Sequence, residues 1–166
     1  IQFYADLLAE HAFEERIGNS LVVKEPVGVV AAITPWNYPL HQIVAKVGPA
    51  LAAGCTVVLK PSEVAPLNAY VLAEVMETAG LPRGVANLVI GSAGEISDEF
   101  MTNPAVRKIS FTGSTEVGKK LMKQAADQVK RVSMELGGHA PFIVFPDADP
   151  EVVAKAAVLG KFRNNG

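Results

Sequence analysis

The sequence predicts an α/β fold in which helices cover both faces of a doubly wound, mostly parallel sheet. Short runs rich in β-branched residues alternate with longer amphipathic segments, which is the pattern of repeated βαβ units. Several of these runs are apolar at successive positions, as expected for strands that are buried on both faces. The 166 residues are 49% hydrophobic and 19% charged, so the chain is large and apolar enough to bury a core.

The predicted elements follow in order along the chain. Residues 4–14 suit a helix, and residues 19–30 suit two strands around a bend at Glu25 and Pro26, outside the main sheet. Gly54 and Gly80 come after two further helices, where a left-handed residue ends a helix. The predicted strands of the main sheet span 27–33, 56–60, 87–90, 108–111, 131–135 and 142–145. The helices between and after them span 40–53, 68–79, 95–101, 115–126 and 151–162.

Composition argues against several classes of function. The 15 Lys and Arg against 17 Asp and Glu give a net charge of −2 without a basic stripe, which disfavours a nucleic-acid partner. No apolar stretch approaches the roughly 18–20 residues that cross a bilayer, so no membrane segment is predicted. The single cysteine, Cys55, fits a reducing compartment, and we expect a cytoplasmic protein. His11, His41 and His139 lack metal-ligand spacing, so we predict no metal site.

Ligands of doubly wound sheets bind at the carboxyl ends of the strands, so the segments that follow the strands are the first place to seek a site. Four of them carry polar or charged side chains beside Pro or Gly, at 34–38, 60–63, 112–114 and 135–138. We therefore expect the functional residues to come from these segments.

Thr112, Gly113 and Ser114 leave a strand and open a helix, so backbone N–H groups there can bind an anion such as phosphate. In the simpler interpretation, Ser114 is only the helix N-cap. The spacing from Gly113 to Lys119 also matches a P-loop, but Lys120 stands where that motif requires Ser or Thr. Nucleotide hydrolysis is therefore disfavoured, and the G-x-G-x-x-G dinucleotide fingerprint does not occur either.

Lys60 and Glu63 place a cation and a carboxylate three residues apart at another strand end. A carboxylate accepts hydrogen bonds from ribose hydroxyls and repels a 2′-phosphate, which favours NAD over NADP. Ser62 beside it can hydrogen-bond a phosphate if the loop shifts, so NADP stays open. The alternative is a solvated ion pair at a helix entrance.

Asn37 and Glu135 are the candidate catalytic groups. Asn37 is a lone amide in a loop stiffened by Pro35 and Pro39, and it suits an oxyanion donor, although such a loop is also a common rigid turn. Glu135 ends a strand before two glycines, and it suits a general base on water or an ordinary carboxylate at a sheet edge. Cys55 precedes an apolar strand and is more typical of a core residue than of a nucleophile.

Taken together, the four motifs resemble the aldehyde dehydrogenase superfamily. They are Pro-Trp-Asn-Tyr-Pro at 35–39, Lys-Pro-Ser-Glu at 60–63, Phe-Thr-Gly-Ser at 111–114 and Glu-Leu-Gly-Gly at 135–138. The resemblance implies NAD(P)-dependent oxidation of an aldehyde to a carboxylic acid through a cysteine thiohemiacetal and thioester. The implied domains are a helix of the cofactor-binding domain at 1–18, an oligomerisation hairpin at 19–30, the NAD(P)-binding domain at 31–136 and the start of the catalytic domain at 137–166.

The resemblance also implies roles for single residues. Asn37 becomes the oxyanion-hole amide, and Glu135 becomes the base that activates water. In the cofactor site, Lys60 and Glu63 hold the adenosine ribose, Thr112 lies by the nicotinamide and Ser114 touches the pyrophosphate. The implied cofactor-binding residues are Ile33, Thr34, Pro35, Trp36, Lys60, Ser62, Glu63, Thr112, Gly113, Ser114, Val117 and Leu136.

By this resemblance the nucleophile is a cysteine a few residues beyond the chain, because residues 164–166 resemble the approach to it and Cys55 does not match. The chain alone is then expected to be inactive. We expect the full-length protein to act as a homodimer or homotetramer, joined in part through the hairpin.

Residues 135–145 and 161–164 resemble succinate-semialdehyde dehydrogenases in particular. In those enzymes an arginine matching Arg163 holds the substrate carboxylate, whereas a plain helix-end arginine is the alternative. Ala45 stands where they usually carry a second arginine. We expect succinate semialdehyde or another small ω-carboxy aldehyde as substrate, with NAD, or possible use of NADP. The alternatives are a broad-specificity aldehyde dehydrogenase and a noncatalytic dinucleotide-binding or assembly module.

Overall fold

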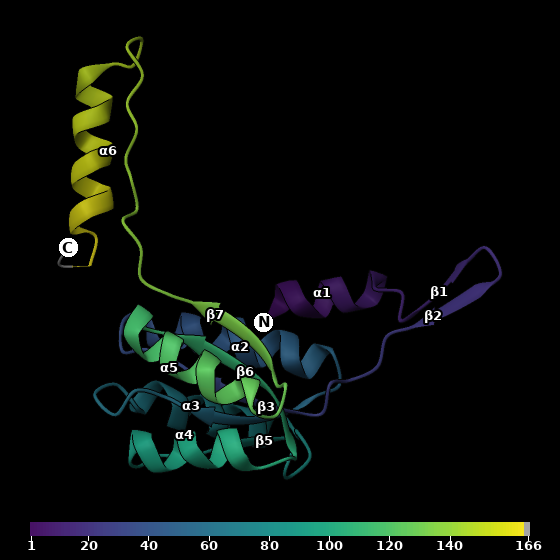
Figure 1. Cartoon of the computed structure of the whole chain (residues 1–166). Helices are drawn as coiled ribbons and strands as arrows, with labels where there is room; N and C mark the ends of the chain where they lie inside the picture. The colour runs from purple at the N-terminus through teal and green to yellow at the C-terminus, as the bar shows by residue number, and fades with distance from the viewer. Residues whose placement is uncertain (165–166) are drawn as a thin grey trace.

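The computed structural model describes residues 1–164 and contains a five-stranded parallel sheet flanked by helices (Figure 1). The strands are β1 (Glu14–Ile17), β2 (Ser20–Val23), β3 (Val29–Ile33), β4 (Thr56–Lys60), β5 (Ala86–Leu88), β6 (Val106–Thr112) and β7 (Arg131–Glu135). The helices are α1 (Gln2–Glu10), α2 (Pro39–Ala52), α3 (Leu67–Thr78), α4 (Ala93–Thr102), α5 (Thr115–Ala126) and α6 (Pro150–Phe162).

The strand order β5-β4-β3-β6-β7 confirms the predicted doubly wound sheet. The chain builds outward from β3 through β4 to β5, then returns to the other side of β3 with β6 and β7. Helices after β3 and β6 therefore leave toward opposite sides, and a crevice opens between the ends of these two strands. Ile33 is in register with Lys60 on one side and with Phe111 on the other, so the strand ends lie level.

The side chains of β3 alternate between two cores, as the period of a strand requires. Val30 and Ala32 pack with α2 and α3, whereas Ala31 packs with α4 and α5. Both cores are closed by fully buried aliphatic side chains, Ile43 on one face and Ile109 on the other. This double burial explains why β3 is apolar at every position, and it supports the sequence-based assignment of the sheet.

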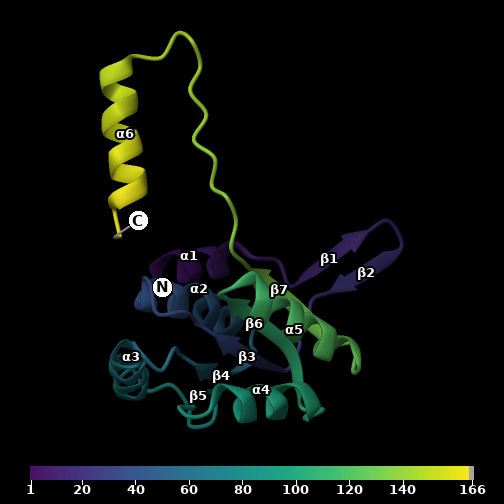
Figure 2. The same ribbon diagram turned by 60° about the vertical axis from the view of Figure 1, so that its left-hand side comes forward.

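The N-terminal elements differ from their predicted bounds. The first helix ends at Glu10 instead of continuing to residue 14, because His11 is extended. The hairpin occupies Glu14–Val23 instead of 19–30, and its turn uses Gly18, with φ of +59°, instead of Glu25 and Pro26. Gly18 followed by Asn19 between two strands is a two-residue turn signal, and it places the turn before the predicted bend. As predicted, the hairpin forms a separate sheet, and it projects away from the main one (Figures 1 and 2).

The predicted strand at residues 142–145 is wrong for this structure. The segment is extended, but it pairs with no described strand, and Phe142, Ile143 and Phe145 are 56%, 73% and 69% exposed. A strand needs a neighbouring strand to hydrogen-bond its backbone N–H and C=O groups. The last strand of the described sheet is β7, which stops at Glu135, and residues 142–145 lie beyond it without such a neighbour. Figures 1 and 2 show α6 beyond this segment and apart from the sheet.

Several other element ends shift by small amounts. The first strand of the sheet begins at Val29 because Gly28 has φ of +111°. The fourth helix begins at Ala93, two residues before its predicted start, because the Ser92 hydroxyl accepts a hydrogen bond from the Glu95 N–H. Gly54 and Gly80 have φ of +74° and +81°, as predicted for residues that follow helices. Among residues 1–164, no helix is long and apolar enough to cross a membrane.

Candidate active site

A cleft of about 1040 Å³ lies between α2 and the exposed face of β6 and β7. It exists because α2 packs over β3 and β4, which leaves the same face of the two neighbouring strands uncovered. Eight of the predicted site residues line this cleft, and they come from the loop after β3 and from the ends of β6 and β7. These are Pro35, Trp36, Asn37, Thr112, Gly113, Ser114, Glu135 and Leu136.

The strand wall of the cleft is polar because of the alternation along β6. Ile109 and Phe111 point into the core shared with α4 and α5, whereas Lys108, Ser110 and Thr112 line the cleft. The neighbouring strand continues this pattern with three more polar side chains in register with them. These are Arg131, Ser133 and Glu135.

Asn37 reaches the cleft from the loop between β3 and α2. Tyr38 follows with φ of +48°, a left-handed conformation unusual for a side chain of this size, and Pro39 then starts the helix. The amide is therefore presented by a short, conformationally restricted turn. Trp36 in the same loop is 62% exposed, so this rim of the cleft carries an open aromatic surface.

The end of β6 is fixed to the end of β7 by a hydrogen bond from the Gly113 N–H to the Glu135 carbonyl oxygen, at 3.1 Å. Ser114 caps α5, because its hydroxyl accepts from the Val117 N–H at 3.3 Å. This cap is the simpler role that the sequence allowed. Val117 itself is 42% exposed on the first turn of α5 and does not line the cleft.

Two buried hydroxyls at the strand ends lack partners, Thr34 Oγ1 after β3 and Thr112 Oγ1 at the end of β6. Buried polar groups normally have a hydrogen-bond partner, so these two are suited to a polar ligand that lies across the crevice. The position matches the site where doubly wound folds bind dinucleotides. The described residues therefore fit NAD or NADP.

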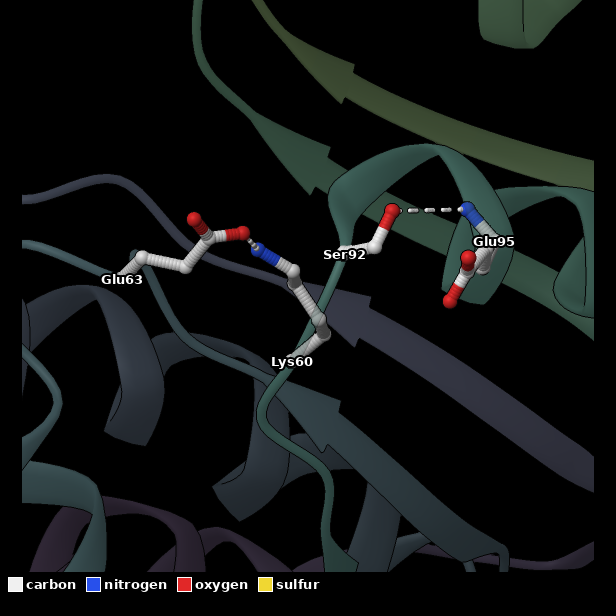
Figure 3. A network of polar contacts seen from close by, with 4 residues as sticks. All are labelled: Lys60, Glu63, Ser92 and Glu95. Carbon is white, nitrogen blue, oxygen red and sulfur yellow. Dashed lines mark hydrogen bonds and ion pairs between the residues drawn. The ribbon is translucent and has the colours of Figure 1, made fainter.

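Lys60 and Glu63 form an ion pair of 3.2 Å at the end of β4 (Figure 3). Lys60 is buried, whereas the Glu63 side chain is 54% exposed, so a ligand can reach this carboxylate from the solvent side of the ion pair. The pair lies near the start of α4, where Ser92 caps the helix (Figure 3). Neither member lines the cleft, nor does the half-buried Ser62, so they form a second group beside it.

Lys46 also lines the cleft, and it was not among the residues predicted from the sequence. It projects from α2, is 8% exposed, and its Nζ donates to Ser110 Oγ at 3.4 Å. Burial lowers the pKa of this lysine below its usual value, and the negative charge of Glu135 partly opposes that shift. A lone lysine at a position otherwise buried in an apolar helix was the signal that could have revealed it.

Leu136 and Ile33 have packing roles. Leu136 lies where a Cβ on Gly118 would be, so this glycine allows α5 to approach the segment that carries Glu135. Ile33 is partly buried against the α4 and α5 core, beside the crevice.

Arg163 lies outside the cleft lining, and its guanidinium carbon is 5.7 Å from the centroid of the Tyr38 ring, within cation–π range. The end of α6 is thereby placed next to the loop that carries Asn37. Residue 164 is the last described one, so most of the predicted 164–166 segment lies outside the described residues.

Cys55 also lines the cleft, but it lies at the start of β4, at the opposite end of the strands from Asn37. It is 5% exposed and packs in the α2 and α3 core, which agrees with the structural role expected from the sequence. The described residues contain no cluster of metal-binding side chains.

Comparison with known proteins identifies the family. The chain matches the Aldehyde dehydrogenase family over residues 1–166. It is 53% identical over 99% of its length to a glutarate-semialdehyde dehydrogenase of Pseudomonas aeruginosa and to an NADP(+) succinate-semialdehyde dehydrogenase of Escherichia coli. In each case it spans 34% of the relative, about a third of its length.

Among solved structures, the chain superposes with a TM-score of 0.95 and 49% identity on an aldehyde dehydrogenase of Pseudomonas syringae in complex with NAD+ and octanal. The match covers 98% of this chain and 34% of that one. The sequence matches and the structural match each cover nearly the whole chain, so the chain belongs to the aldehyde dehydrogenase family.

Proposed function

We propose that the full-length protein oxidises a small ω-carboxy aldehyde, with succinate semialdehyde the first candidate, to the corresponding acid with NAD(P)+. The observation that carries the proposal is the convergence of Asn37 and Glu135 in one cleft, beside the unpartnered Thr112 hydroxyl. An amide donor, a carboxylate base and a crevice suited to a dinucleotide are three of the parts that this oxidation needs, and a thiol nucleophile is the fourth.

In this proposal each group in the cleft has a separate task. The Asn37 side-chain amide donates a hydrogen bond to the oxygen that becomes negative when a thiolate attacks the aldehyde carbon. The bound dinucleotide supplies a hydride acceptor, which Thr34 and Thr112 would help to hold. Glu135 then removes a proton from the water that hydrolyses the thioester, and the acid is released with the thiol restored.

The attacking thiol comes from a part of the full-length protein outside these 166 residues. Cys55 is unsuited to the task because it is buried at the far end of the strands. We therefore propose that the 166-residue chain alone has no aldehyde-oxidising activity.

NAD is the proposed cofactor, with NADP as the alternative. The half-exposed Glu63 carboxylate supports NAD, because it repels a 2′-phosphate and accepts hydrogen bonds from a free ribose hydroxyl. NADP(+) stands in the name of the E. coli relative, whereas the P. syringae structure holds NAD+. Under the NADP alternative, the hydroxyl of Ser62, next to Glu63, would donate a hydrogen bond to the 2′-phosphate.

The ω-carboxy aldehyde is supported by the two semialdehyde dehydrogenases and by Arg163, whose guanidinium lies over Tyr38 beside the cleft. Arginine binds carboxylates with two parallel hydrogen bonds. A broad-specificity enzyme is the second candidate. It is supported by the uncharged octanal bound to the P. syringae relative and by the small side chain of Ala45 in the cleft.

Steady-state formation of NADH and NADPH by the full-length protein tests the proposal, with succinate semialdehyde compared with butanal. We expect kcat/KM to favour succinate semialdehyde by about 100-fold, which corresponds to about 2.7 kcal/mol. Similar values for the two aldehydes would establish the broad-specificity alternative. No reaction with either would contradict aldehyde oxidation and leave a noncatalytic module.

We further propose a cytoplasmic homodimer or homotetramer. The β1–β2 hairpin carries exposed apolar side chains at Leu21, Val22 and Val23, and it projects from the body of the chain (Figure 2). Such a surface is suited to burial against a second subunit. The location is supported by the single free thiol, Cys55, which requires no oxidising compartment.

A further inference from the structure

We propose that His41 recognises the distal carboxylate of the substrate and thereby selects ω-carboxy aldehydes. This inference rests on the proposed function, since it names, in addition to Arg163, a residue of the cleft lining that selects among aldehydes. His41 lies on the first turn of α2, lines the cleft and is exposed.

The place of His41 in the cleft favours this residue. It lies two residues into α2, which begins directly after the loop that carries Asn37, and both residues line the cleft. A four-carbon semialdehyde has only two carbons between its two functional groups, so the groups that bind them must lie near each other. With its aldehyde oxygen at the Asn37 amide, its carboxylate is then offered to the first turn of α2, where His41 lies. The imidazole N–H is a donor suited to a carboxylate oxygen.

The residue on the next turn leaves room for the ligand. Ala45 lines the cleft and is exposed, and its methyl group fills little of the space beside the His41 ring. Gln42 and Lys46 point into the same cleft, but Lys46 is turned to Ser110, to which it donates a hydrogen bond. His41 is thus the exposed basic side chain on this stretch of α2.

Charge at this end of the helix also favours an anion. The first turn of α2 contains no acidic residue, and its unpaired backbone N–H groups add positive potential. The Arg163 guanidinium lies over the ring of Tyr38, the residue that precedes the helix. The two carboxylates in the lining are Glu135, the proposed base, and Glu25, which lies at the other end of the strands.

The test compares His41→Leu with the wild type in the full-length protein, using kcat/KM for succinate semialdehyde and for butanal. We expect the variant to lose about ten- to 100-fold with succinate semialdehyde and less than about threefold with butanal. His41→Gln, which keeps an N–H donor, should restore most of the preference. His11→Leu is the matched control, because His11 lies outside the cleft, against Phe13.

Three results would overturn the inference while aldehyde oxidation itself stands. These are an unchanged ratio of the two kcat/KM values in His41→Leu, an equal loss with both aldehydes, and a wild-type ratio near one. If the wild type oxidises neither aldehyde, the proposed function fails instead. If His41→Leu does not fold, His41→Glu against His41→Gln decides the question. The carboxylate should then lower the ratio at least tenfold below that of the amide, and equal ratios would overturn the inference.

Discussion

Glu135 is the side chain on which the proposed hydrolysis depends. Replacing it with Gln in the full-length protein removes the base but keeps the size and most of the hydrogen bonding of the side chain. We expect kcat to fall by about 10²- to 10⁴-fold. Stopped-flow measurement should still show one rapid equivalent of reduced cofactor per site, because the first oxidation step does not use this base.

Glu116→Gln is the matched control for that variant, because Glu116 is an exposed carboxylate paired with Lys120 on the outer surface of α5. It should retain wild-type kcat. A Glu135→Gln enzyme with kcat within about twofold of wild type would show that another group activates the water.

The buried charge of Lys46 lowers the free energy of unfolding by an amount that depends on pH. Its pKa in the folded protein is below the value of 10.5 that it has when unfolded, chiefly because of burial. Between the lowered pKa and 10.5 the unfolded chain therefore binds more protons than the folded one, and stability rises with pH. Below that window the buried charge destabilises the fold by a constant amount.

Lys46→Met removes the buried charge and keeps the length of the side chain. We expect the gain in Tm of this variant over the wild type to be largest near pH 7 and to shrink as the pH approaches 10.5. Thermal unfolding of the full-length protein measured across this range checks the trend. A Tm difference that is constant with pH, or that grows with it, would contradict the argument.

The contact between α1 and α2 depends on Gly48, which has no side chain to separate the two helices. A Cβ on Gly48 in α2 would lie 2.5 Å from the Tyr4 ring of α1, so the missing side chain lets the two helices meet. Gly48→Ala gains up to ~1 kcal/mol of helix propensity but must displace that ring. We expect the loss of the contact to outweigh the gain and the Tm to fall by a few degrees.

Gly94→Ala provides the comparison, because its Cβ would make only an ordinary contact, 3.9 Å from Ser92 Oγ in α4. This variant should keep or raise the Tm in the same thermal assay. If Gly48→Ala proved as stable as Gly94→Ala, the approach of α1 to α2 would not depend on the glycine.

The proposed subunit contact through the β1–β2 hairpin can be tested by the molar mass of the full-length protein. Leu21 and Val23 lie on the same face of β2 and are 57% and 50% exposed. Placing Asp at both positions puts two charges into the proposed subunit contact, so we expect a lower molar mass by light scattering. Val129→Asp, at a position 88% exposed and outside the hairpin, should not change the mass. An unaltered mass for the double variant would exclude this face as the subunit contact.

Much of the architecture follows from local patterns in the sequence. Alternating apolar runs predicted the doubly wound sheet, and the bounds of β4, β7 and α5 are those predicted. Strand ends also located Asn37, Thr112 and Glu135, because the carboxyl edge of a parallel sheet is a fixed feature of this fold. Such signals succeed because each is carried by neighbouring residues in the chain.

Tertiary packing decided the rest. Whether residues 142–145 pair as a strand depends on a partner that lies elsewhere, and no described strand provides one. The cleft exists because α2 covers β3 and β4 but not β6 and β7, and that uneven coverage turned Lys46 and His41 into lining residues. Residues far apart in sequence meet there only after the sheet has formed, so their shared surroundings cannot be read from their neighbours in the chain.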